Sequence, residues 1–163
     1  MAPYKDNRGP TPDVVLIERM SGEDDGETAL LRKMFEEAKA YILSFSWCDS
    51  IISAHFAGEV GKVFAIFLFN INSNRPDVDP WEWVFVGDAP PAYLPLEDAP
   101  SKMAAFETYL EGMGRWVAAA RQRREPQPED RCPPVNLPST PESTESLDIR
   151  LRTLSEVIRP FFE

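Results

Sequence analysis

The sequence predicts an α+β protein in which an antiparallel sheet of three to four strands is flanked by a long N-terminal helix and two C-terminal helices. Three observations predict this class. A stripe of apolar residues at helical spacing comes first, two apolar strand-like segments around a glycine-bearing connection follow, and the helical spacing then returns twice. Because the helical and extended segments are grouped along the chain, an antiparallel sheet is favoured.

Residues 1–24 are expected to be a poorly ordered or docking segment, followed by a single α+β domain of residues 25–163. Within this segment only residues 14–20 ("VVLIERM") have the pattern of an edge strand or a short docking element. The segment lacks the apolar core of a secretory signal. The longest apolar run, residues 63–69, is far shorter than the roughly 20 residues that span a bilayer. We therefore expect a soluble, cytoplasmic protein with no membrane contact.

The first helix is predicted from an apolar stripe that follows the acidic stretch at residues 22–27. A hairpin comes next, with strands at residues 48–56 and 62–71 joined by residues 57–61 ("AGEVG"). The second strand is apolar on both faces. It is therefore predicted to lie in the centre of a sheet that is covered on both sides.

A third strand is predicted at residues 81–86 ("WEWVFV"), where the side chains alternate between two faces. One face carries the aromatic residues and the other carries a glutamate and two valines: Trp81, Trp83, Phe85 and Glu82, Val84, Val86. Gly87 and Asp88 then provide turn chemistry. Pro90 and Pro91 stiffen the following extended segment, a possible short strand that presents Tyr93.

Two further helices are predicted in the C-terminal half. The first lies between Pro100 and Arg124, where the apolar stripe returns. Residues 125–139 are rich in proline, which favours an extended connector. The last helix is predicted to begin at Thr140 as N-cap with Pro141 in its first position.

The charge of the chain limits its partners. The formal net charge is -10 and the pI is about 4.6, which argues against nucleic-acid binding because phosphate contacts need clustered Lys and Arg. Between residues 70 and 100 six acidic side chains stand against Arg75 alone, so half of the net charge falls in this stretch. Complementary charge steers association, so a basic protein is the predicted partner.

The candidate binding residues are the acidic and aromatic side chains of this stretch: Asp77, Asp79, Trp81, Glu82, Asp88 and Tyr93. We predict no metal and no cofactor. Asp77 and Asp79 lack the spacing of a calcium loop, and Cys48 and Cys132 are far apart and outside any CxxC pair. The sequence thus favours a non-enzymatic binding protein.

Two alternatives stay open at this point. The first is a small enzyme that uses Cys48 or His55, the single histidine, with Asp88 brought close by the fold. The second is a structural homodimer formed through an uncovered apolar face of the sheet.

Three stretches of the chain resemble a family of small uncharacterised bacterial proteins: "SFSWC" at residues 44–48, "WVFVGDAPPAYL" at residues 83–94 and "TPESTESLDIRLRTL" at residues 140–154. The resemblance covers residues 29–161. It implies the same layout of a helix, a sheet and two helices, and it carries no activity, ligand or catalytic residue. Small acidic proteins of this kind are sometimes immunity partners of secreted bacterial toxins, which is an analogy for the role of this chain.

Overall fold

The computed structural model describes residues 14–60, 64–122 and 140–162, and it contains a five-stranded sheet. The strands lie in chain order and each pairs antiparallel with the next. They are β1 (Val15–Leu16), β2 (Cys48–Val60), β3 (Phe64–Ser73), β4 (Trp81–Gly87) and β5 (Ala92–Pro95). The α+β class is confirmed, whereas the predicted three to four strands were too few.

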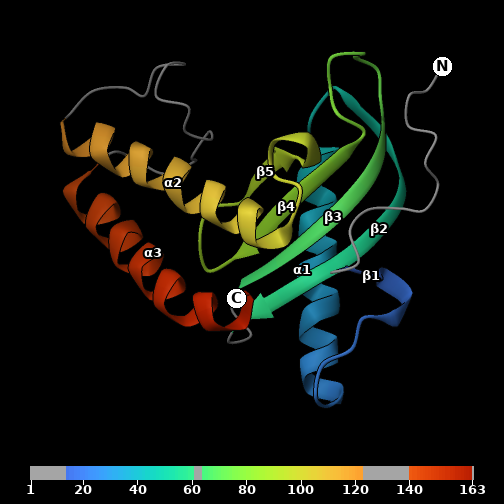
Figure 1. Cartoon of the computed structure of the whole chain (residues 1–163), viewed down its shortest axis with the longest axis horizontal. Coiled ribbons are helices and arrows are strands. Elements are labelled where there is room, and N and C mark those ends of the chain that lie inside the picture. Colours follow the sequence, from blue (N-terminus) through green and yellow to red (C-terminus); the bar gives the residue numbers. More distant parts are fainter. Residues whose placement is uncertain (1–13, 61–63, 123–139, 163) are drawn as a thin grey trace.

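Three helices cover the sheet. They are α1 (Asp25–Leu43), α2 (Lys102–Arg121) and α3 (Pro141–Phe162), with short 3-10 helices η1 (Ile17–Arg19) and η2 (Leu96–Asp98). Helix α1 packs on one face of the sheet, and α2 and α3 lie side by side on the other (Figure 1). A separate apolar core fills each interface. No helix in the described ranges combines the length and the apolarity needed to cross a bilayer.

The central position predicted for the second strand of the hairpin is confirmed, because β3 lies between β2 and β4. Phe64 and Leu68 point to the core under α2 and α3, and Phe67 and Phe69 point to the core under α1. The alternation predicted for β4 is also found. Trp81, Trp83 and Phe85 lie on the α2 side, and Val84 and Val86 lie on the α1 side.

The connection of the hairpin differs from the prediction. Strand β2 continues through Val60, so most of the predicted connection at residues 57–61 is strand. Gly58 pairs with Ile66, and the register shifts between Phe56 and Gly58. A bulge of this kind accommodates an extra residue while the ladder continues, which is why a glycine does not end the strand here. Residues 61–63 lie outside the described part of the chain.

The sequence allowed two forms for residues 14–20, an edge strand or a docking element. The structure contains the edge strand. Val15 pairs with Phe56 and Leu16 with His55, at the outer edge of β2. Met20 is buried in the core under α1. Residues 14–20 thus belong to the packed domain, although the predicted boundary placed them before it. Residues 1–13 lie outside the described ranges.

A side-chain oxygen accepts a hydrogen bond from a backbone N–H group in the first turn of each of the helices α1, α2 and α3. The Asp24 carboxylate accepts a hydrogen bond from the Glu27 N–H at 2.8 Å, and Ser101 Oγ accepts one from the Ala104 N–H at 3.1 Å. The Ser143 N–H donates to Thr140 Oγ1 at 3.2 Å, so the predicted start of α3 is confirmed. The predicted connector at residues 125–139 lies outside the described residues.

The turn after β4 also follows the sequence. Gly87 has φ 132°, a conformation that residues with a side chain rarely adopt. The Tyr109 hydroxyl of α2 donates to the Pro90 carbonyl at 2.8 Å and holds the following loop on the α2 side. The possible short strand is present as β5 at the edge of the sheet, where the missing N–H of Pro95 costs little.

Candidate functional site

The six candidate binding residues do not form one cluster. Asp77 and Asp79 lie in the loop between β3 and β4, and Tyr93 lies on β5. Trp81 and Glu82 are consecutive in β4, so they face opposite sides of the sheet. Asp88 follows the far end of β4. The structure brings Asp77, Asp79, Glu82 and Tyr93 to one end of the sheet, where Trp81 points to the opposite face, and leaves Asp88 at the other end.

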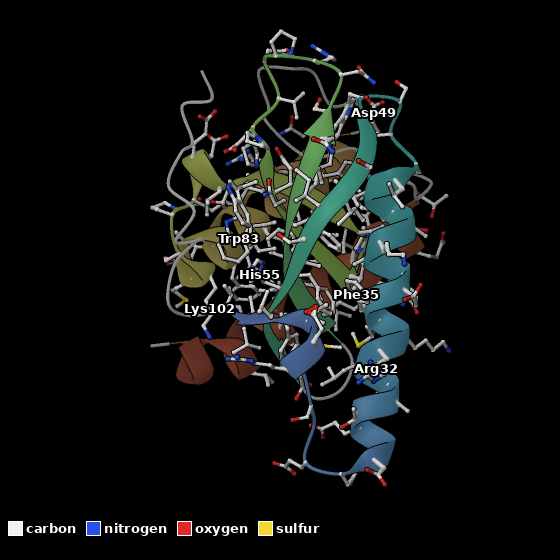
Figure 2. All side chains as sticks on the ribbon, turned by 90° about the vertical axis from the view of Figure 1, so that its right-hand side faces the viewer. Arg32, Phe35, Asp49, His55, Trp83 and Lys102 are labelled. Carbon is white, nitrogen blue, oxygen red and sulfur yellow. The ribbon has the colours of Figure 1, made fainter. Side chains whose placement is uncertain are left out.

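Three segments meet at this end of the sheet: the corner between α1 and β2, the loop between β3 and β4, and β5 with η2. Asn74 joins the first two, because its N–H donates to the Trp47 carbonyl at 3.1 Å and its side-chain amide donates to Ser46 O and Asp49 Oδ1 at 2.7 and 2.9 Å. Figure 2 shows Asp49 at the upper end of β2, beside the top of α1. We call this region the acidic–aromatic end and define it by its side chains: Phe45, Trp47, Asp49, Asp77, Asp79, Tyr93, Glu97 and Asp98.

The aromatic part of this region is a contiguous cluster of three half-buried rings. The ring centroids of Phe45 and Trp47 are 5.0 Å apart, those of Phe45 and Tyr93 are 4.9 Å apart, and those of Trp47 and Tyr93 are 5.1 Å apart. Tyr41 of α1 extends the cluster with an edge contact to Phe45 at 5.2 Å, and burial raises its pKa to about 12. Half-buried aromatic rings with a polar rim are typical of interface cores.

Asp79 has a structural role within the acidic part. Its Oδ1 accepts from the Trp81 N–H at 2.9 Å, and its Oδ2 accepts from the Glu97 N–H at 3.0 Å. One carboxylate therefore ties the start of β4 to η2. Hydrogen bonds to a charged group of this kind are among the stronger ones in proteins, so the acidic group also positions the strand.

Asp77 forms an exposed ion pair. Arg75 Nε and an Arg75 Nη donate to its two oxygens at 3.1 and 2.6 Å, and both side chains are more than half exposed. This hydrogen bond with Arg75 lowers the pKa of Asp77. The pair reduces the local field of Asp77, and Asp49, Glu97 and Asp98 are the other exposed acidic groups of this region.

Glu82 is the most unusual group at this end of the sheet. It is 1% exposed, it lies on the α1 face of β4, and its Oε1 has no hydrogen-bond partner among the described residues. Burial, together with the nearby carboxylates of Asp79, Asp98 and Glu97, raises its pKa from 4.5 to about 9. Glu82 is therefore a neutral carboxylic acid at pH 7, and it adds nothing to the surface charge that the sequence assigned to it.

The groups of the alternative enzyme are not brought together. Cys48 lies in the core under α1, whereas the ring of His55 packs 5.7 Å from that of Trp81 on the other face. Cys48 pairs with Ser73 at one end of β3, while Gly87, next to Asp88, pairs with Phe64 at the other end. Nine steps along a strand separate these ends by about 30 Å. Hydrogen-bond contact among the three groups is thus excluded.

The pKa shifts of Cys48 and His55 also do not favour catalysis by either group. Burial, with Asp49 and Glu82 nearby, raises the pKa of the Cys48 thiol, so the reactive thiolate is disfavoured. Burial lowers the pKa of His55, and its Nδ1 has no hydrogen-bond partner among the described residues. In the same part of the chain no three His, Cys, Asp or Glu side chains are grouped so as to hold a metal ion.

The apolar face required by the homodimer alternative is covered in this structure. Within residues 14–60, 64–122 and 140–162, one face of the sheet packs against α1 and the other against α2 and α3 (Figure 1). The large apolar side chains that are exposed in these ranges are distributed over β1, α1, β2 and α3, with Ile52 on β2 and Ile149 on α3 as the most exposed. Scattered residues of this kind are normal on a monomer surface.

The sequence interpretation missed the aromatic cluster and the state of Glu82. Phe45 and Trp47 lie at a helix end and a strand start, and only the tertiary contact with Tyr93 groups them. The burial of Glu82 had a signal in the sequence, because the alternation of β4 placed it on the same face as Val84 and Val86. A carboxyl group on an otherwise apolar strand face indicates a buried acid.

The fold and this region define an α+β protein with a five-stranded antiparallel sheet between two helical layers, and with an acidic and aromatic surface at one end. Comparison of the chain with protein-family models, with curated proteins and with solved structures finds no match in any of the three. The inference about function therefore depends on the chemistry of the acidic–aromatic end.

Proposed function

We propose that the protein is a non-enzymatic binding protein whose acidic–aromatic end recognises a basic protein. The observation that carries this proposal is that a half-buried cluster of three rings and several exposed carboxylates lie at the same end of the sheet. Aromatic side chains provide apolar contact area at interface cores, and the surrounding charge steers a basic partner toward them.

The role of each side chain follows from its contacts. Phe45, Trp47 and Tyr93 form the apolar contact area. Asp49 and Asp98 supply exposed negative charge at the rim. Trp81 and Asp88 belonged to the binding site inferred from the sequence, and in this proposal they lie outside the contact surface: Trp81 lies in the core under α2, and Asp88 follows the opposite end of β4. Asp79 lies at the acidic–aromatic end, where it ties β4 to η2.

The charged rim is tested by a triple variant with Asp49→Asn, Asp77→Asn and Asp98→Asn. These three acids lie on separate segments and are exposed, and Asp79 is left unchanged because it holds β4. We expect affinity capture from native cell extract to recover a basic protein with the wild type and at least about tenfold less of it with the variant at low salt. The dissociation constant of the purified pair should also depend less steeply on ionic strength in the variant.

The matched control neutralises three exposed acids on the α2 and α3 side of the sheet: Glu111→Gln, Glu142→Gln and Glu156→Gln. It changes the net charge by the same amount and leaves the rim intact. Capture by this control should equal capture by the wild type. If both variants capture the partner equally well, the acidic–aromatic end is not the binding surface.

An immunity-type or inhibitory role is the specific form of this proposal. It is supported by the acidity of the chain and by the analogy with small acidic immunity proteins. In such a role the basic partner is a toxin or an enzyme, and complex formation blocks its activity. The captured protein identifies the role directly, because its activity is measured with and without this chain.

A further inference from the structure

The buried Glu82 carboxyl group requires an explanation that the fold does not supply. A buried polar group is normally hydrogen-bonded, and each exception in a native structure marks strain, a ligand site or a functional role. Glu82 Oε1 has no such partner among the described residues, although the side chain is almost fully buried. An apolar residue at this position would pack with Val84 and Val86 at no desolvation cost.

Glu82 lies next to the aromatic cluster. In the register of β4 and β5, Val84 pairs with Tyr93 and Glu82 pairs with Pro95, so Tyr93 is the diagonal neighbour of Glu82 on the α1 face. The carboxylate of Glu82 also raises the pKa of Tyr93 and of Cys48, which places both groups within electrostatic range. Glu82 therefore lies beside Tyr93, which belongs to the aromatic cluster.

The ionisable groups around Glu82 are mostly acidic. They come from every element at this end of the sheet: Asp79 before β4, Glu97 and Asp98 on η2, Tyr93 on β5, Cys48 with Asp49 on β2, and Tyr41 on α1. The cation that acts on Tyr93 is Arg75, and its guanidinium group is engaged with Asp77. The environment thus favours the entry of a cation from outside.

We propose that the buried carboxyl group of Glu82 is the anchor for one arginine side chain of the basic partner, which stacks on Tyr93 at the edge of the aromatic cluster. This inference rests on the proposed function and names the chemistry of its binding site. Arginine is favoured because its guanidinium group stacks on aromatic faces, is weakly hydrated and pairs with a carboxylate through two parallel hydrogen bonds. The aromatic rings provide the stacking surface, and Glu82 provides the carboxylate.

Binding of an arginine side chain to Glu82 should change the protonation state of the Glu82 carboxyl group. The neutral carboxylic acid of Glu82 loses its proton to solvent as the guanidinium cation arrives, and the two form an ion pair. One proton is released for each arginine bound, so the affinity rises with pH while Glu82 is neutral in the free protein. Cys48 and Tyr93 have raised pKa values and His55 faces the other side of the sheet, so Glu82 is the group at this end that responds.

The experiment uses butylguanidinium as the probe and the full-length chain, followed by NMR between about pH 6 and pH 8 at moderate salt. The dissociation constant of the wild type should fall by about tenfold for each pH unit. With Glu82→Gln the binding should be weaker and independent of pH, while Asp88→Asn at the opposite end of the sheet should behave as the wild type does. Butylammonium, which is more strongly hydrated, should bind more weakly than butylguanidinium.

A second measurement keeps the test decisive if Glu82→Gln fails to fold. In the wild type at pH 7, the carboxyl carbon of Glu82 should move from the chemical shift of the acid to that of the carboxylate as butylguanidinium saturates the site. An unchanged shift, or a dissociation constant that does not vary with pH, would overturn the inference. Equal affinity for butylammonium would overturn the choice of arginine.

The outcomes also separate this inference from the function on which it rests. If the triple rim variant loses capture of the basic protein and wild-type binding of butylguanidinium is independent of pH, the surface function stands and the role of Glu82 is wrong. If butylguanidinium binds with the predicted pH dependence and capture survives the rim variant, the Glu82 site stands and the acidic rim is not the recognition surface.

Discussion

Replacing Glu82 with glutamine should stabilise the protein at alkaline pH and have little effect near pH 5. Burial and the neighbouring carboxylates of Asp79, Asp98 and Glu97 raise the pKa of Glu82 from 4.5 to about 9. Between these two values the folded state holds a proton that the unfolded state has lost, so stability falls as pH rises. The fall is at most about 1.4 kcal/mol per pH unit.

The sign of this effect is specific to a raised carboxyl pKa. The stability contributed by the protonated Glu82 is fully present below about pH 4.5, and it is lost as pH rises to about 9. Glutamine has nearly the shape of the neutral acid and does not titrate. The difference in unfolding free energy between Glu82→Gln and the wild type should therefore grow by on the order of 3 kcal/mol between about pH 5.5 and pH 8.5.

Urea unfolding at several pH values measures this difference. The control is Glu111→Gln, which removes an exposed carboxylate of α2. Its unfolding free energy should change with pH in parallel with that of the wild type. If the curves of Glu82→Gln and the wild type are also parallel, Glu82 is ionised in the folded protein. The account of the buried neutral acid is then wrong.

Replacing Trp83 with alanine should cause the largest loss of stability of any single substitution considered for this protein. Trp83 is 0% exposed in the core between the sheet and α2, and its indole N–H donates to the Ala99 carbonyl at 2.8 Å. Figure 2 shows it on the side of the sheet opposite to Phe35 of α1. Removing a buried tryptophan costs about 3 to 5 kcal/mol, and the Ala99 carbonyl also loses its partner.

Thermal unfolding followed by far-UV circular dichroism tests this expectation. A loss of about 4 kcal/mol corresponds to a fall in the melting temperature of roughly 10 °C in a chain of this size. Trp83→Phe keeps much of the apolar burial and should lose less than half as much. Ile52→Ala changes a side chain that is 56% exposed, and should stay within about 0.5 kcal/mol of the wild type. A small effect of Trp83→Ala would contradict the core assigned to this face.

The fold was predictable where local pattern and burial agree. The apolar residues on both faces of β3 required a central strand with two covers, and both covers are present as α1 and the pair α2 and α3. The capping residue Thr140 indicated the start of the last helix. Periodicity and caps are local properties of the chain, so the sequence is sufficient to show them.

The missed parts of the fold depend on pairing with a distant segment. The pattern of residues 14–20 left an edge strand and a docking segment open, and Val15 and Leu16 form a strand because the outer edge of β2 accepts them. Gly58 looks like a turn residue, yet a register shift next to it lets β2 continue. Sheet edges and bulges are set by the partner strand, which sequence periodicity does not contain.

The acidic charge of the candidate site could be predicted from the sequence, whereas the contacts among the rings could not be, and the burial of Glu82 was missed. Counting acids singled out the stretch between residues 70 and 100, in which Asp77 and Asp98 are exposed at the acidic–aromatic end. It also counted Glu82 as a surface charge, although the fold buries that side chain and keeps it neutral. Trp47 joins the cluster only through tertiary packing against Tyr93. Charge is additive along a sequence, whereas burial and ring contacts are properties of the folded chain.

The central claim is that the acidic–aromatic end is the functional surface, and the footprint of the captured basic protein on this chain tests it most directly. The measurement is the change in amide and indole NMR signals of the isotope-labelled chain when the unlabelled partner is added. The account predicts that the changes concentrate at Trp47, Asp49, Asp77 and Tyr93 and are small at Asp88. A footprint centred on Asp88, or on the exposed faces of α2 and α3, would contradict it.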